Sequence, residues 1–373
     1  MADRPDGFGR AYCDWMVEKA LPFWADAGWW GDRGCYFERL DLTGAPLPET
    51  PLRVRTQARQ IYTYAHAHVL GWGESHLDKA EAAMASLRQR AWAPDRRPGW
   101  AHVLTPDGVV ANPLRDAYDH AFILHALAWM GRATGDVAYY RWADETLAFM
   151  DDGLKADHGG WAEDDIGSLP RRQNPHMHAF EAMLALYECT GDGVYRERAD
   201  RLYALFMARF LDRDVPGVRE FFDAAWNVAP GQKGDTLEPG HFSEWVWLLR
   251  RYGRNGGAPE EGLSTALLES AQRLGLDERS GFLIDEVWPD GRALSPSRRL
   301  WVQTEYLKAL TVEGRFGEGQ AVMDRMMGTY LADAPVGAWC DRYDGESKPM
   351  VDHLPASTLY HLFGAVIEVA GKG

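Results

Sequence analysis

Cysteine, basic charge and long apolar runs are all scarce in this chain. Its four cysteines, Cys13, Cys35, Cys189 and Cys340, lie far apart and form no CxxC pair. Forty lysines and arginines stand against 55 aspartates and glutamates, and the net charge of −15 argues against nucleic acid and anionic membranes as partners. No stretch approaches transmembrane length, and residues 1–12 lack the apolar run of a signal peptide. We therefore expect a cytoplasmic protein with reduced thiols.

The motifs of several common chemistries are also missing. There is no GxGxxG and no P-loop, so nothing indicates a bound nucleotide, and there is no HExxH zinc motif. His176 with His178, and His241 with Glu244, have spacings that a metal could use, but no segment supplies a third and fourth ligand. We therefore expect catalysis without a metal and without a cofactor.

A glycine-led segment rich in aromatic residues occurs six times, and a helix-like run follows each copy. The copies begin at Gly34, Gly99, Gly160, Gly217, Gly281 and Gly337, which are 56 to 65 residues apart. Such a period fits one tight hairpin and two helices per unit. The sequence thus predicts a single all-α domain over residues 1–373, an (α/α)6 barrel of six helix pairs. Short β-hairpins gather at one mouth, where loops on a rigid scaffold carry function.

A second self-match indicates how the helices are arranged. The runs from His120 and His176 share eight residues at an offset of 56. The first helix of each pair is apolar nearly all round and the second is amphipathic, so we expect an inner ring of first helices and an outer ring of second helices. The inner helices are expected to begin near six residues: Arg59, Tyr118, His178, His241, Trp301 and His361.

Polar side chains at these helix starts should converge on one pocket. Asn174 before Pro175 is typical of an N-cap, and His178 lies over the same face. His241 and Glu244 are three apart and can touch, in which case the carboxylate would raise the pKa of the imidazole. Taken alone, His241 could equally be a hydrogen-bonded core residue, and for His361 the core interpretation would be favoured.

The convergence itself favours proton transfer. His241 and His361 come from different units and titrate near neutrality, where acid–base catalysts are most effective. Arg59, with neutral donors such as Tyr118, would stabilise an enediolate oxyanion. Glycoside hydrolysis would instead need two carboxylates, and the spacing singles out no pair. The possible members are Asp119, Asp164, Glu244 and Glu305.

Tryptophans and arginines near the mouth suggest how a sugar is bound. Four tryptophans in or beside the hairpins could stack on a sugar ring: Trp100, Trp161, Trp288 and Trp339. Two arginine pairs, Arg171–Arg172 and Arg298–Arg299, could bind phosphate. We expect these arginines to pair instead with carboxylates of their own hairpins, so that the free sugar is preferred over its 6-phosphate. Those carboxylates are Asp164, Asp165, Asp285 and Glu286.

The mouth segments together resemble the N-acylglucosamine 2-epimerase family, within it the mannose isomerase-like branch of aldose–ketose isomerases. The matching stretches are QARQIY, AYDHAF, NPHMH, EPGHFSEW, RRLWVQTE and LPASTLYH, spread over all six units. The resemblance implies an (α/α)6 barrel, metal-free catalysis and a cytosolic sugar substrate. It also implies that His241 and His361 are the acid–base pair.

Substrate-binding residues follow from the same resemblance. Those that match in the family bind or polarise the sugar: Arg59, Asn174, His178 and Glu244. Tyr118, Trp301 and Glu305 are expected beside them. We expect an isomerase of D-mannose and D-fructose that works through a cis-enediolate, as a monomer or homodimer. The alternatives are a 2-epimerase of N-acylglucosamine or another reducing sugar, and a glycan-cleaving or carbohydrate-binding protein on the same barrel.

Overall fold

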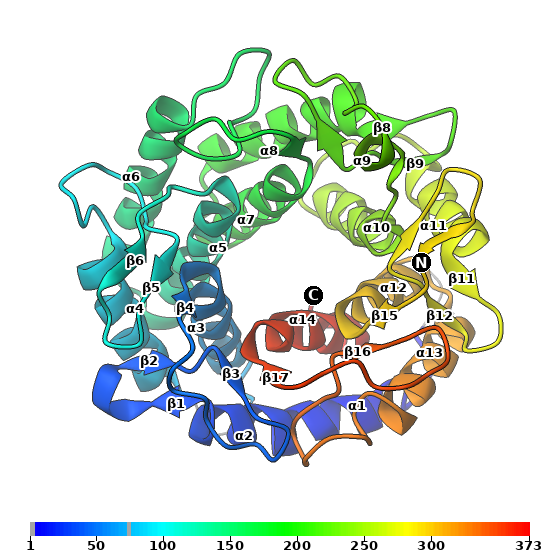
Figure 1. The fold of residues 1–373 in the computed structure, drawn as a ribbon, viewed down its shortest axis with the longest axis horizontal. Coiled ribbons are helices and arrows are strands. Elements are labelled where there is room, and N and C mark those ends of the chain that lie inside the picture. The colour runs from blue at the N-terminus through cyan, green and yellow to red at the C-terminus, as the bar shows by residue number, and fades with distance from the viewer. Residues whose placement is uncertain (1–3, 73–75) are drawn as a thin grey trace.

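Two concentric rings of helices make up the structure (Figure 1), a computed structural model that describes residues 4–72 and 76–373. The inner ring consists of α3 (Val54–Val69), α5 (Ala117–Thr134), α7 (Asn174–Thr190), α10 (Pro239–Arg254), α12 (Leu300–Val312) and α14 (Leu359–Val369). The outer ring consists of α4 (Leu77–Ala91), α6 (Ala138–Gly153), α8 (Gly193–Leu205), α11 (Leu263–Gly275), α13 (Phe316–Gly328) and the N-terminal helix. That helix runs through α1 (Arg10–Trp15), the π-turn η1 (Met16–Ala20) and α2 (Leu21–Asp26), and a second π-turn, η3 (Phe206–Phe210), extends α8.

Burial separates the two rings as the apolar patterns predicted. In α7 every residue of the range 175–186 is buried, because the helix is covered on all sides. In α8 only Tyr195, Ala199 and Leu202 are buried, on one face. The predicted (α/α)6 barrel is therefore confirmed, with twelve main helices in the described part of the chain. The outer partner of α14 is α1, so the two ends of the chain meet in one helix pair.

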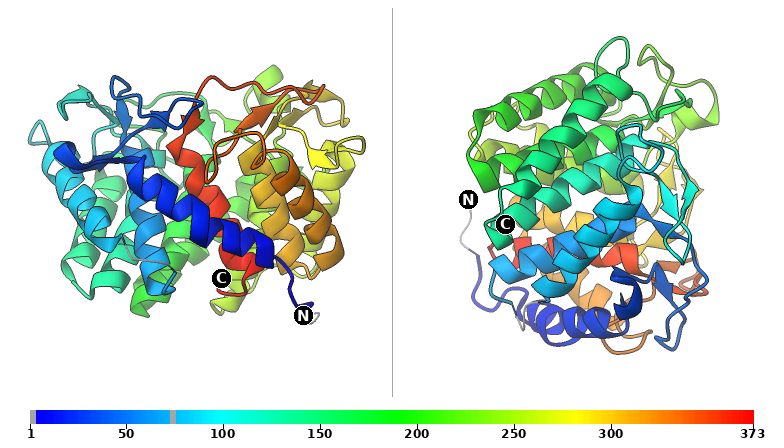
Figure 2. Two further views of the ribbon diagram at one scale, coloured as in Figure 1. Left: turned by 90° about the horizontal axis from the view of Figure 1, so that it is seen from below. Right: turned by 90° about the vertical axis from the view of Figure 1, so that its left-hand side faces the viewer.

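Short antiparallel strands tie neighbouring units together at one end of the barrel (Figure 2). The strand before an inner helix pairs with the segment after the next outer helix. These pairs are β4 (Leu52–Arg53) with β5 (Val103–Leu104), β7 (Arg171–Arg172) with β10 (Phe221–Phe222), and β15 (Arg298–Arg299) with β16 (Arg342–Tyr343). Bridges Asp116–Asp164 and Leu237–Val287 complete two more positions. β17 (Leu354–Pro355) pairs with β3 (Arg39–Leu40) and closes the ring.

The remaining short elements belong to the hairpins and helix starts. The hairpin strands are β1 (Trp29–Trp30) with β2 (Cys35–Tyr36), β8 (Leu211–Asp212) with β9 (Gly217–Val218), β11 (Leu276–Asp277) with β12 (Phe282–Leu283), and β13 (Glu286–Val287) with β14 (Ala293–Ser295). β6 (Val110–Asn112) adds a third strand to β4 and β5. The helical turns are η2 (Gly31–Arg33), α9 (Gln232–Asp235) and η4 (Ala356–Thr358).

The repeated glycines allow each hairpin to approach the helices closely. Gly160 has φ +66°, and a Cβ there would lie 2.7 Å from His176 Nε2. This Nε2 accepts the backbone N–H of Trp161 at 2.9 Å, and His120 Nε2 accepts that of Trp100 at 3.0 Å. The repeated histidines, His120 and His176, thus hold the hairpins in place, which explains why a histidine recurs at this position of the self-match.

Candidate active site

The inner helices share one register, which brings equivalent positions to one level. Five of them begin with a backbone N–H that donates to the adjacent hairpin segment: Val54, Ala117, Gln173, Leu300 and Ala356. Pro239 holds the same place in α10, beside the Leu237–Val287 bridge. Five residues further on, the six helices present Arg59, Phe122, His178, Glu244, Glu305 and His361. One helical level therefore carries most of the side chains predicted to be functional.

A cavity of about 360 Å³ opens above this level, inside the ring of hairpins. Its walls are Arg59, Tyr118, Arg172, Asn174, His178, Glu220, Phe221, Glu238, His241, Glu244, Arg299, Trp301 and His361. Every residue predicted to be catalytic or to bind substrate lies on these walls except Glu305. The volume is suited to a monosaccharide, and the lining is mostly polar with a few aromatic faces.

His241 lies between two carboxylates. Its Nδ1 is 2.9 Å from Glu220 Oε2 and 3.9 Å from Glu238 Oε2. Burial alone would lower the pKa of His241, but Glu220 and Glu238 outweigh it and raise this pKa to about 9. His241 is therefore a cation at neutral pH. The sequence predicted a carboxylate partner for His241 but placed it at Glu244, whereas the hydrogen-bonded partner is Glu220 from the hairpin.

Asn174 holds the other side of the His241 ring. Its Nδ2 is 3.0 Å from His241 Nε2, and its Oδ1 has no hydrogen-bond partner. A doubly protonated imidazole donates from both nitrogens, so the amide oxygen is the atom that suits this contact. The prediction that Asn174 caps its helix was wrong, because α7 already includes Asn174 and its N-cap is Gln173. The side chain is free to face the cavity.

His361 is in the opposite protonation state. Its Nδ1 is 2.8 Å from Glu305 Oε1. Burial, followed by the positive charges of Arg59 and Lys308, holds the pKa of His361 well below 6.5. Glu305 itself is fully buried behind His361. This position does not fit the expectation that Glu305 contacts the sugar. The position reached by its carboxylate suits orientation of the imidazole rather than contact with a ligand.

His178 and Glu244 form the floor of the cavity. His178 Nδ1 is 3.1 Å from Glu181 Oε2 and 3.8 Å from Glu244 Oε1, and burial lowers the pKa of His178 to about 4. Neither oxygen of Glu244 has a hydrogen-bond partner. Burial, followed by the charge of Glu305, raises the pKa of Glu244 well above 4.5. This environment favours the protonated form of Glu244, in which the carboxyl group can donate to a ligand hydroxyl.

Two aromatic contacts orient the remaining predicted residues. Arg59 Nη2 donates to the Tyr118 hydroxyl at 2.8 Å, and its guanidinium lies 4.1 Å from the Phe122 ring centroid. The Trp301 ring is 5.1 Å from that of His241 and 5.7 Å from that of His361, measured between centroids. Trp301 therefore lies beside both histidines and offers an apolar face in the cavity.

The two mouth arginines are tied to carboxylates. The Arg172 backbone N–H donates to Glu163 Oε2 at 2.9 Å, and its guanidinium pairs with the same carboxylate. Arg299 lies 3.3 Å from both Asp285 and Glu238. The expected pairing is confirmed for Arg299 with Asp285. For Arg172 the partner is Glu163, one residue before the predicted Asp164.

The hairpin tryptophans do not face the cavity. Trp100 and Trp339 are fully buried and Trp161 nearly so, because they pack between the hairpins and the outer helices. Trp339, for example, stacks on Trp24 with 4.7 Å between ring centroids. Trp288 is also absent from the walls. The expectation that these four stack on a sugar was wrong, and the tryptophan on the cavity wall is Trp301.

The repeated hairpins carry a signal that the sequence analysis missed. Five of the six copies have an acidic residue three or four positions after the glycine, namely Glu38, Glu163, Glu220, Asp285 and Asp341. In three of them it binds an arginine just before the inner helix: Arg53, Arg172 and Arg299. In the fourth unit Glu238 stands in the place of that arginine, and Glu220 binds His241 instead. A departure from a repeated ion pair thus distinguishes the unit that carries His241.

Three groups of side chains in the described ranges lie close enough to share a metal ion. They are His102 with Asp116 and Asp119, His178 with Glu181 and Glu244, and Glu220 with Glu238 and His241. In each group the histidine Nδ1 already hydrogen-bonds a carboxylate. The last two belong to the cavity, so metal-free catalysis stays a prediction for experiment. Across residues 4–72 and 76–373, no helix is both long and apolar enough to span a membrane.

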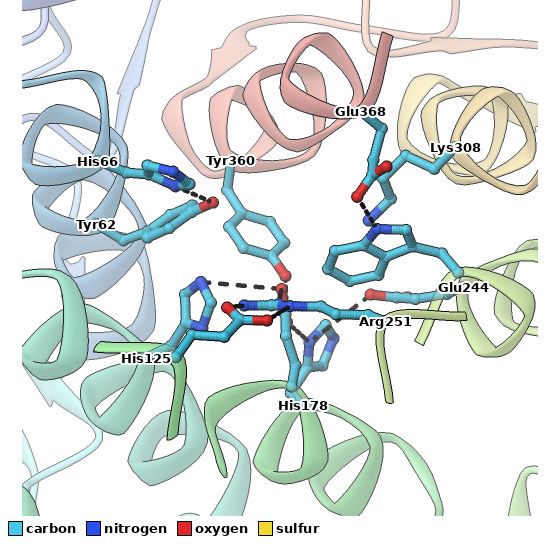
Figure 3. A network of polar contacts seen from close by, with 12 residues as sticks. Tyr62, His66, His125, His178, Glu244, Arg251, Lys308, Tyr360 and Glu368 are labelled. Atoms are coloured by element: carbon cyan, nitrogen blue, oxygen red, sulfur yellow. Dashed lines mark hydrogen bonds and ion pairs between the residues drawn. The ribbon is translucent and has the colours of Figure 1, made fainter. Parts of the chain in front are cut away.

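A second cavity, of about 320 Å³, lies on the far side of the floor. The same counting gives a lower level. Eight residues after the helix starts at 54, 117, 173, 239, 300 and 356, the inner helices present Tyr62, His125, Glu181, Trp247, Lys308 and Gly364. All but His125 line this second cavity. Figure 3 shows Tyr62, His125, Tyr360 and Lys308 converging from different helices. Tyr360 donates to Glu181, which also binds His178, so a single polar layer separates the two cavities.

Comparisons with known proteins show the family and the fold of this chain. Residues 35–365 match the family model for N-acylglucosamine 2-epimerase (GlcNAc 2-epimerase). A mannose-6-phosphate isomerase of Rhizobium meliloti is 33% identical over 376 residues, or 95% of each chain. A D-mannose isomerase of Thermobifida fusca is 29% identical, over 90% of each chain. A crystal structure of a D-mannose isomerase superposes over the full length of both chains with a TM-score of 0.87 at 20% identity, which shows the shared fold.

Proposed function

Because the chain belongs to the N-acylglucosamine 2-epimerase family, we propose that it interconverts a free aldose and its ketose, D-mannose and D-fructose. The family and the named relatives are isomerases and epimerases, so the chain is an enzyme of that class. The observation that carries the proposal is the pair of histidines beside Trp301, one cationic and one neutral. Environments that push two pKa values apart assign an acid and a base.

His361 is the base. Its Nδ1–H donates to Glu305, which leaves the Nε2 lone pair for the substrate. In the open-chain aldose this nitrogen removes the proton on C2, and the electron pair moves toward the C1 carbonyl to form a cis-enediolate. Burial lowers the pKa of His361, which keeps its imidazole neutral near neutral pH.

His241 is the acid. Arg59 stabilises the negative charge that develops on O1, and His241, as a cation, then donates a proton to O1 to give the neutral enediol. The neutral His241 then takes the proton from O2 while protonated His361 returns its proton to C1. Both histidines regain their starting states, and the product is the ketose. Glu244 and His178 hold sugar hydroxyls from the floor.

A 2-epimerase is the second candidate, since the same enediolate can be protonated on the other face of C2. The favouring observation is that a second proton donor, His241, is present beside the same Trp301 ring as His361. A phosphorylated substrate is favoured less. Arg172 and Arg299 line the cavity, but each guanidinium is already paired with a carboxylate of its own.

The test is incubation of the protein with D-mannose in D2O, without added metal or nucleotide, followed by NMR. Formation of fructose supports the isomerase, with deuterium at C1 to the extent that the proton on His361 exchanges with solvent, and deuterium at C2 of glucose supports the epimerase. Turnover of mannose 6-phosphate alone would overturn the free-sugar proposal. Cleavage of oligosaccharides with no change in mannose would overturn both. The His361→Ala variant serves as the negative control.

A further inference from the structure

The two histidine–carboxylate pairs are built alike but differ in the group behind the carboxylate. His241 Nδ1 is 2.9 Å from Glu220, and His361 Nδ1 is 2.8 Å from Glu305. Behind Glu220 is the neutral amide of Gln173, whose Nε2 donates to Glu220 Oε2 at 3.1 Å. Behind Glu305 is an ammonium group, since Lys308 Nζ lies 2.5 Å from Glu305 Oε2.

Lys308 is placed so that its charge acts on Glu305. It lies one turn after Glu305 on α12, and its side chain is only 2% exposed. Its Nζ is 3.6 Å from the centroid of the Trp247 ring. Among the described residues, Glu305 is the one carboxylate within 4.0 Å of this ammonium. A buried lysine is costly unless it is paired, so the pair with Glu305 is the arrangement that keeps both charges in the barrel.

We propose that Lys308 is a positioning residue: its ammonium holds Glu305 ionised as the acceptor of the His361 Nδ1–H, and it offsets the Glu305 charge so that His361 stays in its neutral, proton-accepting form. The proposal rests on the proposed function of His361 as base. It assigns the different roles of the two histidines to the residues behind their carboxylates. The amide of Gln173 carries no charge, so Glu220 keeps its full negative charge and stabilises the cationic form of His241. The ammonium of Lys308 offsets the charge of Glu305, so the cationic form of His361 is not stabilised in the same way.

Other charged groups near His361 also affect its pKa. Cationic or protonatable groups come from α3, α7, α10 and α12: Arg59, His178, His241 and Lys308. Carboxyl groups come from α7, α10 and α12: Glu181, Glu244 and Glu305. Burial raises the pKa of Glu305, and the Lys308 charge acts against that rise. Removing Lys308 removes a positive charge, so the Glu305–His361 pair gains affinity for a further proton.

That further proton would stop His361 from acting as a base. A proton added to the imidazole occupies Nε2, the nitrogen that must accept from C2. A proton added to the carboxylate turns Glu305 into a donor to Nδ1, which shifts the imidazole proton to Nε2. In Lys308→Met, which has a similar length and no charge, we expect the apparent pKa of His361 to rise by about 1 unit. The acid limb of the kcat/KM profile should move to higher pH by the same amount.

Labelled-histidine NMR and pH–rate profiles measure these two shifts separately. The NMR titration of His361 needs no turnover, so it tests the role of Lys308 even if the proposed reaction is wrong. An unmoved His361 titration in Lys308→Met overturns the proposal, whatever happens to the rate. Lys308→Arg, which keeps the charge, is the matched control and should titrate like the original protein.

Chemical rescue supplies an independent measurement. Lys308 lines the second cavity, so a small amine can reach the space left in Lys308→Ala. Ethylammonium should restore the original acid limb, whereas neutral propanol should not. If neither variant folds, the Glu305 carboxyl signal of the original protein decides the matter. A Glu305 that is protonated at pH 7 overturns the proposal, and an ionised one supports it.

Discussion

The Glu220 carboxylate binds the imidazole of His241, although the same position in three other hairpins binds an arginine. Those structural pairs are Glu38 with Arg53, Glu163 with Arg172, and Asp285 with Arg299. In the fourth unit the arginine is exchanged for Glu238, which lies 3.9 Å from the same imidazole. The hairpin carboxylate that pairs with an arginine in three units thus raises the pKa of a histidine in the fourth.

Removal of either histidine should abolish catalysis while the fold remains. We expect His241→Ala and His361→Ala each to lower kcat by about 10²–10⁴-fold, because each supplies a positioned proton donor or acceptor. Assays on a confirmed substrate, with circular dichroism to verify folding, check this. His176→Ala is a useful contrast, since His176 clamps a hairpin and should affect stability more than chemistry. Near-normal turnover in either catalytic variant would refute the assignment.

The pH profile should have an alkaline limb set by His241. Because this acid must carry its proton, kcat/KM should fall as pH rises through about 9. The acid limb should lie well below pH 6.5, since His361 loses its function only when it becomes protonated. In Glu220→Gln the pKa of His241 loses its main support and the alkaline limb should move to lower pH. An alkaline limb that stays in place would show that another group sets it.

Restoring the repeated ion pair in the fourth unit should lower kcat. In Glu238→Arg the new guanidinium can bind Glu220, as arginine does in three other units. We expect the pKa of His241 to fall and kcat to drop by about 10²-fold, with little loss of stability. Glu238→Gln, which removes the charge without creating the pair, should cost less. Equal losses in both variants, measured in kcat and thermal unfolding, would contradict this explanation.

Activity should survive prolonged treatment with EDTA. The histidines of the cavity hydrogen-bond carboxylates through Nδ1, and enediolate chemistry can proceed on these groups alone. The measurement is kcat before and after chelation, with metal analysis of the treated protein. Loss of activity that a single divalent ion restores would assign a metal to one of the carboxylate groups.

Mannose should be preferred to mannose 6-phosphate in kcat/KM. Arg172 and Arg299 are engaged with Glu163 and Asp285, which leaves no unpaired guanidinium on these two for a phosphate. Arg172→Ala and Arg299→Ala should therefore change the ratio of the two substrates little. Arg53→Ala, which removes the same type of anchor away from the cavity walls, controls for structural effects. A phosphate preference that collapses in either cavity variant would reverse this conclusion.

Much of the barrel could be predicted from the sequence because it repeats. The spacing of glycines and the alternation of apolar and amphipathic helices reflect local rules, and they predicted both rings. Arg59, His178 and His361 were found because equivalent turns of the inner helices face one axis. Glu220 was missed because its partner, His241, is 21 residues away and is chosen by packing between a hairpin and a helix.

The errors have a common physical origin. Trp100, Trp161 and Trp339 stand beside mouth hairpins in sequence, yet burial against the outer helices gives each of them more contact than an open mouth would. Asn174 has the sequence of a cap, but its helix begins one residue earlier than a cap requires. Glu305 was predicted to face the cavity, but its side chain points from α12 toward His361 on the neighbouring helix α14. Sequence indicates the level of a residue in the barrel better than its direction.

The pairing of β17 with β3 has a consequence for how the enzyme comes into being. This contact joins residues more than 300 positions apart, and it sets α14, which carries His361, against α3, which carries Arg59. A nascent chain therefore cannot bring His361 to the cavity until α14 has left the ribosome and the ring has closed. If His361 acts as proposed, we expect activity to arise in a single late step, and two separately expressed fragments split between units should be inactive alone and active when mixed.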